Sequence, residues 1–130
     1  MLTDTTDATF AVGDRWKFAT PRAGSRGATF TILKIESDGA QGTIIHVSID
    51  GIRIPSARAP GGFIEAIGHM PCTRVAIVAS SPTIVEKGGA LPAFEEGYRM
   101  WREAFDSGRG GVFSISLADA VEFMARTLAG

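Results

Sequence analysis

The sequence predicts an α+β domain, and three observations support this fold class. Apolar and polar side chains alternate over much of residues 15–56, as in half-buried strands. The last third carries apolar stripes at helical spacing. The chain has 130 residues, 45% of them hydrophobic, which suits one domain with one core. We expect an antiparallel β-meander, with a small curled barrel as its alternative form, followed by a C-terminal helix–strand–helix.

The chain is expected to begin with a tail that is followed by short strands. Residues 1–10 are polar and acidic and are expected to form a flexible tail, which leaves residues 11–130 as the single domain. In the strand expected at 15–20, Trp16 and Phe18 alternate with charged residues. The loop at 21–28 contains glycine and proline, and the strand at 29–36 is rich in β-branched residues.

A hairpin is the next prediction, because Asp50-Gly51 lies between two alternating runs at 43–49 and 52–56. A two-residue turn there would pair Ile49 with Ile52 and place His46 near Arg53. The segment after it is harder to interpret. Residues 63–67 are too short to assign, and we expect a helix at 73–80 that ends before Pro82.

Two helices are expected in the last third. The first spans residues 91–108, with Pro92 at its first position and Gly108 as its terminator. Its apolar stripe consists of Phe94, Tyr98, Trp101 and Phe105. A short strand follows within 110–116. Ser116 and Asp119 resemble a capping box for the final helix, whose stripe consists of Leu117, Val121, Met124 and Leu128.

Charge and cysteine content set expectations about location and partners. The net charge is −1, yet residues 15–58 hold seven basic and three acidic groups. No apolar run reaches the length of a membrane span, the N-terminal residues lack the pattern of a secretory signal, and there is one cysteine. We therefore expect a cytoplasmic protein with no membrane partner.

The only cysteine lies three residues after one of the two histidines. A reactive pair would need the base within hydrogen-bond reach of the thiol. Pro71 lies between His69 and Cys72 and favours extended backbone before it, so the two side chains are expected to diverge. We interpret the segment as a loop histidine followed by a small buried cysteine.

The second histidine, His46, falls on the polar side of its predicted strand. A site gathered from His46, Arg53 and His69 is the alternative to a purely structural role for these residues. No recognised metal-ligand spacing includes them, so the sequence predicts no metal and implies no cofactor. No catalytic residue is identified, because paired carboxylates and nucleophile motifs are absent from the sequence.

The loop at 21–28 offers a different kind of site. Arg22 and Arg26 lie among small residues, where guanidinium groups and backbone amides could hold an anion such as phosphate. Nucleic-acid binding would also need exposed aromatic side chains, and those of the first strands are better explained as core. Anion or nucleic-acid binding through this basic half is therefore a disfavoured alternative.

Three stretches resemble a group of small uncharacterised bacterial proteins. They are GTIIHVSIDGIRI at 42–54, IGHMPC at 67–72 and LPAFEEGYRMWREAFDSGRGGVFSISLADAVEFM at 91–124. The resemblance attaches no activity, substrate or cofactor. It implies only that His46, His69, Tyr98 and Trp101 belong to a shared pattern.

The favoured function is a non-enzymatic binding or protein-interaction module, of which an accessory or immunity-type protein would be one form. A core pattern without a convincing catalytic set motivates this hypothesis, and its favoured partner is another protein. A small-ligand-binding domain or an enzyme with a site around His46, Arg53 and His69 is the alternative. A homo-oligomer stays open.

Overall fold

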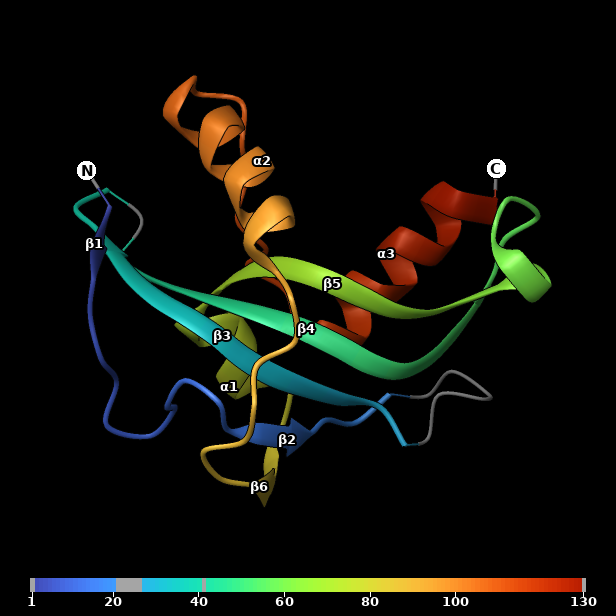
Figure 1. The fold of residues 1–130 in the computed structure, drawn as a ribbon, viewed down its shortest axis with the longest axis horizontal. Helices are drawn as coiled ribbons and strands as arrows, with labels where there is room; N and C mark the ends of the chain where they lie inside the picture. Colours follow the sequence, from blue (N-terminus) through green and yellow to red (C-terminus); the bar gives the residue numbers. More distant parts are fainter. Residues whose placement is uncertain (1, 21–26, 41, 130) are drawn as a thin grey trace.

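The structure, a computed structural model, describes residues 2–20, 27–40 and 42–129, and it confirms the α+β class (Figure 1). Within these described residues, six antiparallel strands form one sheet, accompanied by three helices and one short 3-10 helix. The strands are β1 (Thr3–Asp4), β2 (Arg15–Lys17), β3 (Thr29–Asp38), β4 (Gly42–Pro55), β5 (Phe63–Thr73) and β6 (Thr83–Glu86). The helices are η1 (Pro60–Gly62), α1 (Arg74–Ala79), α2 (Glu95–Asp106) and α3 (Leu117–Ala129).

The sheet is an extended meander. Strands β2, β3, β4 and β5 are hydrogen-bonded in chain order, and β6 adds next to β2. Strand β3 uses one edge for β4 and divides the other edge between β2 and β1. Over the residues that are described, the sheet stays open with β5 and β6 at its edges, so the alternative of a closed barrel is wrong.

The predicted hairpin at Asp50-Gly51 is also wrong, because β4 runs without interruption through both residues. Gly51 has a φ of +76°, and the register between β4 and β5 shifts between Asp50 and Ile54. The positive φ therefore produces a bulge within one strand rather than a turn between two. The chain reverses further on, where the Ser56 N–H donates to the Gly62 carbonyl over 2.9 Å.

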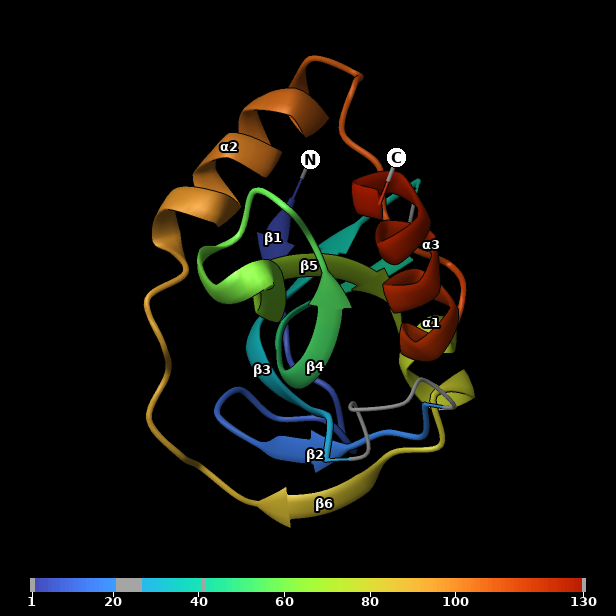
Figure 2. The same ribbon diagram turned by 90° about the vertical axis from the view of Figure 1, so that its right-hand side faces the viewer.

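The core lies on one face of the sheet. Alternate residues of β3 and β4, such as Phe30 and Val47, are fully buried there. Helices α1 and α3 cover this face through Ile77, Leu117 and Val121. Figure 2 shows α1 and α3 on one side of the sheet and α2 on the other. No helix within the described part of the chain is long and apolar enough to cross a membrane.

The N-terminal residues are packed against the sheet, so the flexible tail expected over residues 1–10 is wrong for the described part, 2–10. Thr3 pairs with Ser37, and Leu2 and Phe10 are buried. Asp7 accepts a hydrogen bond of 2.6 Å from Arg74 Nε. Apolar contacts at both ends and this ion pair in between hold a segment whose composition is typical of a tail.

The helices lie close to their predicted positions. Helix α1 falls inside the expected range 73–80, and the Ser116 hydroxyl accepts from the Asp119 N–H at the start of α3 as predicted. Helix α2 begins at Glu95, so Pro92 precedes the helix instead of opening it. The strand expected within 110–116 is reduced to one parallel bridge between Phe113 and Cys72.

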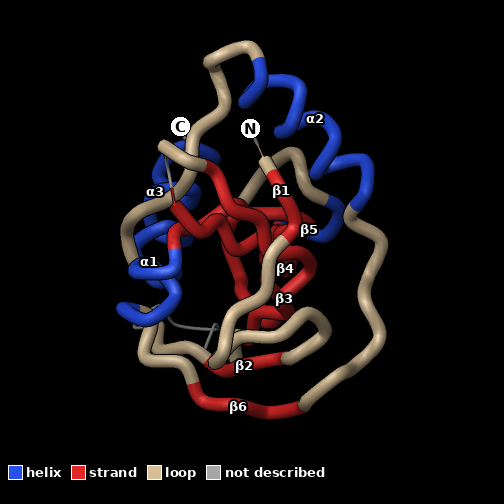
Figure 3. Tube along the Cα trace, turned by 90° about the vertical axis from the view of Figure 1, so that its left-hand side faces the viewer, coloured by secondary structure: helices blue, strands red, loops and turns tan. Residues whose placement is uncertain are grey.

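An apolar stripe at helical spacing is typical of a helix packed on the core, but α2 buries no side chain completely across its twelve residues. The reason is its position on the face opposite α1 and α3, where it contacts β5 and leaves much of its surface exposed. An extended connection, residues 87–94, leads from β6 along the outside of the sheet to α2 (Figure 3). Its start is fixed where the Gly89 N–H donates to the Gly13 carbonyl over 2.9 Å.

Candidate functional site

Beneath α2 the sheet carries polar side chains, and we call this surface the polar face; it is defined by Lys34, Glu36, His46 and His69. The alternation of strand residues places them there. Lys34 pairs with His46 across β3 and β4, and Glu36 lies two residues further along β3. His46 pairs in turn with Pro71 of β5, so His69 is its diagonal neighbour on the same face.

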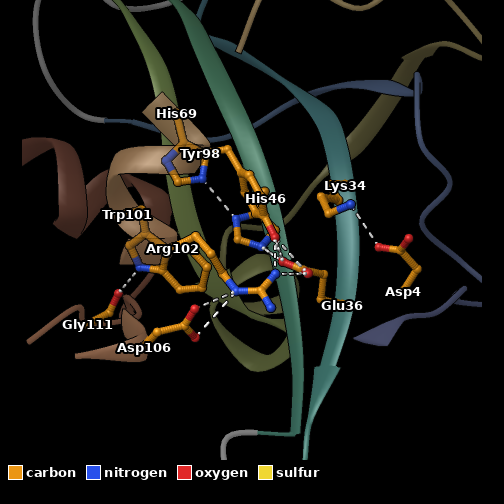
Figure 4. Close-up of polar contacts among 10 residues, drawn as sticks. All are labelled: Asp4, Lys34, Glu36, His46, His69, Tyr98, Trp101, Arg102, Asp106 and Gly111. Carbon is orange, nitrogen blue, oxygen red and sulfur yellow. Dashed lines mark hydrogen bonds and ion pairs between the residues drawn. The ribbon is translucent and has the colours of Figure 1, made fainter. Parts of the chain in front are cut away.

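The two histidines contact each other directly. His46 Nδ1 lies 2.9 Å from His69 Nε2, and the rings are stacked with centroids 5.1 Å apart (Figure 4). On its other side, His46 Nε2 lies 2.8 Å from Glu36 Oε1. Glu36, His46 and His69 therefore form one continuous hydrogen-bonded chain that starts in the interior, where Glu36 is 2% exposed.

Helix α2 completes the network from above. The Tyr98 hydroxyl donates to both carboxylate oxygens of Glu36, over 2.9 and 2.8 Å, and accepts from Arg102 Nη1 over 2.9 Å. Arg102 Nη1 also lies 3.6 Å from Glu36 Oε2. The Trp101 ring packs edge-on against His46 with centroids 4.8 Å apart. The buried carboxylate thus joins α2 to the sheet.

Burial keeps both imidazoles neutral near pH 7. Desolvation lowers the pKa of His46 to about 3, and the neighbouring His69, Lys34 and Arg102 act in the same direction. Desolvation alone lowers the pKa of His69 to about 4. A neutral imidazole has one nitrogen that donates and one that accepts, which matters for what His69 can bind.

His69 also forms part of the wall of a hollow between β5 and α2. The hollow has a volume of about 390 Å³ and is lined by Gly68, His69, Ala93, Phe94, Gly97 and Met100. Gly97 allows α2 to approach the strand here, since a Cβ at this position would lie 3.2 Å from His69 Cβ. The wall is mostly apolar and contains one imidazole.

A second hollow of about 380 Å³ is lined in part by residues 90–92 of the connection 87–94. It is lined by Gly13, Arg15, Thr31, Asp50, Glu86, Ala90, Leu91 and Pro92. Its charged side chains partly satisfy one another, since Arg15 lies 3.6 Å from Glu86 and both are exposed. Among its described lining residues there is no imidazole comparable to His69.

The structure brings together two of the candidate site residues and separates a third, Arg53, from them. His46 and His69 touch, whereas the Arg53 guanidinium stacks on the Phe63 ring, 3.8 Å from its centroid, near the far end of β4. The expectation that Arg53 lies beside His46 depended on the hairpin and is wrong with it. Arg22 and Arg26 lie outside the described residues.

Sequence reasoning missed three members of the network: Glu36, Tyr98 and Arg102. Glu36 carried a usable signal, because an acidic residue inside a strand that is apolar at both phases needs a buried partner. Tyr98 and Arg102 are one turn apart on α2, so they reach the same carboxylate. Their partner lies more than sixty residues earlier in the chain, and no local pattern indicates it.

Cys72 is separate from this site. It follows His69 by three residues on β5, points to the core face and is fully buried. Its thiol lies 3.8 Å from the Met70 carbonyl oxygen, and burial raises the pKa of Cys72 to about 12. The divergence of His69 and Cys72 that Pro71 predicted is present in the structure.

Alkylation of Cys72 should therefore be very slow. A buried thiol of raised pKa presents almost no thiolate at neutral pH, and thiolate is the reacting form. We expect iodoacetamide to modify the folded protein at pH 7.5 at least about a hundredfold more slowly than free cysteine. Mass spectrometry of timed samples measures the rate, and a urea-unfolded sample serves as the control. A rate equal to that of free cysteine would contradict the burial of this thiol.

The basic half of the chain is partly neutralised by acidic groups from outside it. Lys34 Nζ lies 2.8 Å from Asp4 Oδ1, and Arg15 pairs with Glu86. Among the residues that the structure describes, no three His, Cys, Asp or Glu side chains are placed to hold a metal ion.

The chain matches no protein-family model, and comparisons with curated proteins and with solved structures find no match.

Proposed function

We propose that this protein is a small-ligand-binding domain whose ligand occupies the hollow between β5 and α2. One observation carries the proposal: an imidazole held in place by a buried hydrogen-bonded chain forms part of the wall of a hollow of about 390 Å³. Ligand sites are typically concave and mostly apolar, with a few fixed polar groups that orient the ligand.

The chemistry of the wall favours binding over covalent catalysis. The residues described around the hollow offer one imidazole and apolar groups, and no hydroxyl, thiol or amine side chain. Cys72 is buried on the other face of the sheet. A nucleophilic mechanism would need such a group within reach of the ligand.

The protein-interaction function that the sequence favours stays a prediction. Val75 and Val78, one turn apart on α1, are exposed, and exposed apolar side chains are typical of protein-binding surfaces. The hollow has more specific features than this surface, because His69 is oriented by two buried residues. A small ligand is therefore the proposal that the geometry supports best.

A titration with p-cresol, a small apolar molecule with one hydroxyl group, tests the proposal. In ¹H–¹⁵N spectra, saturable shifts are expected at the backbone amides of Gly68 and Gly97, which line the hollow. The variant Ala93→Trp should abolish these shifts, because an indole at this position would fill the hollow. Ala90→Trp is the matched control, since Ala90 lies on the same connection but lines the second hollow.

Unchanged amides around the hollow throughout the titration would contradict the proposal. Equal loss of binding in both tryptophan variants would also contradict it, because this result would place the probe elsewhere or indicate a general distortion of the connection.

A further inference from the structure

We infer that Glu36 and His46 fix the hydrogen-bonding polarity of His69, so that its Nδ1 is an acceptor facing the hollow and selects ligands with an N–H or O–H donor on an apolar body. The ligand class rests on the proposed function. The polarity of His69 does not, because it follows from the network alone.

The direction of the network is set at its inner end. Arg102 has donors only, so the Tyr98 hydroxyl accepts from Arg102 and gives its own proton to Glu36. With this hydroxyl donating to both of its oxygens and a guanidinium 3.6 Å away, Glu36 is held as a carboxylate. A carboxylate only accepts, and its contact with His46 Nε2 therefore requires a proton on that nitrogen.

The same donor and acceptor rules assign the proton positions on His46 and His69. Neutral His46 with a proton on Nε2 has a bare Nδ1, which accepts from His69 across the 2.9 Å contact. The proton in that contact must therefore be on His69 Nε2. Neutral His69 then has a bare Nδ1, and this nitrogen lies on the side of the ring away from His46 (Figure 4). Because His69 is the one polar side chain among the described residues that line the hollow, we assign this bare nitrogen to the hollow as its acceptor.

This polarity determines what fits. A ligand hydroxyl or amide N–H can donate to Nδ1, whereas an anion would face an unprotonated nitrogen. The first turn of α2 adds to this preference, because it carries Glu95 and Glu96 next to the lining residue Phe94. The Glu95 carboxylate already accepts from the Phe94 N–H over 3.0 Å and so competes for the donors at this helix end.

The tautomers can be measured on the protein without ligand. In ¹⁵N spectra correlated to the ring carbon protons at pH 7.5, both histidines should show a protonated Nε2 and a bare Nδ1. A protonated Nδ1 on His69 would overturn the inference. This measurement on the native chain decides the point whether or not any variant folds.

Glu36→Gln tests whether Glu36 sets this polarity. Arg102 requires an oxygen at the position of Glu36 Oε2, so the amide nitrogen of the glutamine must face His46. That amide donates to His46 Nε2, which moves the His46 proton to Nδ1 and the His69 proton to its own Nδ1. We expect both tautomers to reverse, which a merely structural role for Glu36 would not produce.

Asp4→Asn is the matched control, because it removes a carboxylate that pairs with Lys34 next to the network without contacting either imidazole. Its tautomers should equal those of the native chain. Unchanged tautomers in a folded Glu36→Gln variant would overturn the assigned role of Glu36.

A pair of probes tests the ligand class. Native protein should bind p-cresol about tenfold more tightly than 4-methylanisole, which has a similar apolar body but lacks the donor. In Glu36→Gln this ratio should fall to about one, because Nδ1 would then be a donor. Equal binding of the two probes to the native chain would overturn the donor selection. If both tautomers are as inferred but neither probe binds, the ligand class and the proposed function are both overturned. The polarity of His69 would still stand, because the tautomers are measured without ligand.

Discussion

Lowering the pH from 8 to 5 should reduce the free energy of unfolding by about 3 kcal/mol. In the unfolded chain both histidines titrate near their ordinary pKa of 6.5, whereas in the folded chain burial lowers the pKa of His46 to about 3 and that of His69 to about 4. At pH 8 neither state carries these protons. As the pH falls through 6.5 the unfolded state takes them up and the folded state does not, so stability is lost.

The contributions of the two residues differ. Fully buried His46 accounts for about 2 kcal/mol of the loss at pH 5, and half-buried His69 for less, because solvent screens it. Asp7 affects stability in a different pH range. The hydrogen bond from Arg74 lowers the pKa of Asp7 to about 2, so its contribution to the free energy of unfolding is lost only below about pH 4.

Urea denaturation followed by tryptophan fluorescence at pH 8, 7, 6 and 5 measures this loss. His69→Gln is the control variant, because its amide nitrogen reaches the position of the imidazole Nε2 and can still donate to His46 Nδ1, while one titrating group is removed. The variant should lose less stability over the same range than the native chain does. A free energy of unfolding that stays constant from pH 8 to pH 5 would show that the imidazoles are not held neutral.

Local signals predicted the helices well. The Ser116 cap and the terminator Gly108, whose φ is +77°, act within a few residues of the helix ends they define. The β-branched run at 29–36 likewise predicted most of β3. These features depend on side chains that lie close together in sequence, so a single sequence contains the information needed to predict them.

Pairings across the chain were not predictable in this way. Strand β5 follows a turn at 56–62 that Pro60-Gly61-Gly62 marks, but its register with β4 shifts twice, which no local signal indicates. The contact between His46 and His69 depends on that register, so residue type could nominate each histidine but could not pair them. Glu36 and Arg102 join the site only after α2 folds back over the sheet.

The bulge at Gly51 accounts for the one strong local signal that failed. Asp-Gly favours a type I′ turn because both residues tolerate positive φ. In β4 the glycine keeps its positive φ, but the backbone of Gly27 lies so close that a Cβ at position 51 would be 2.7 Å from the Gly27 carbonyl oxygen. Close approach of a second backbone segment, rather than a change of direction, is what requires glycine here.

Gly51→Ala should therefore destabilise the protein far more than Gly42→Ala does. Both glycines lie in β4 with nearly equal φ angles, +76° and +75°, so the backbone cost of alanine, about 1 kcal/mol, is shared. A Cβ at Gly42 would meet no described atom within 4 Å, whereas at Gly51 it would meet the backbone of Gly27 and Ala28. We expect a loss of about 1 kcal/mol at position 42 and of about 3 kcal/mol or more at position 51.

Urea denaturation at pH 8 measures both losses under conditions in which the histidines are neutral in the folded and unfolded states. The comparison distinguishes the two folds that the sequence allows. In a hairpin with an exposed turn, Gly51 would carry only the cost of its positive φ, and the two variants would be equally destabilised. With a continuous β4, the Gly51 variant should have the lower free energy of unfolding of the two. The added methyl group must push apart two backbone segments, and the pairing of Thr29 with Asp50 holds these segments together.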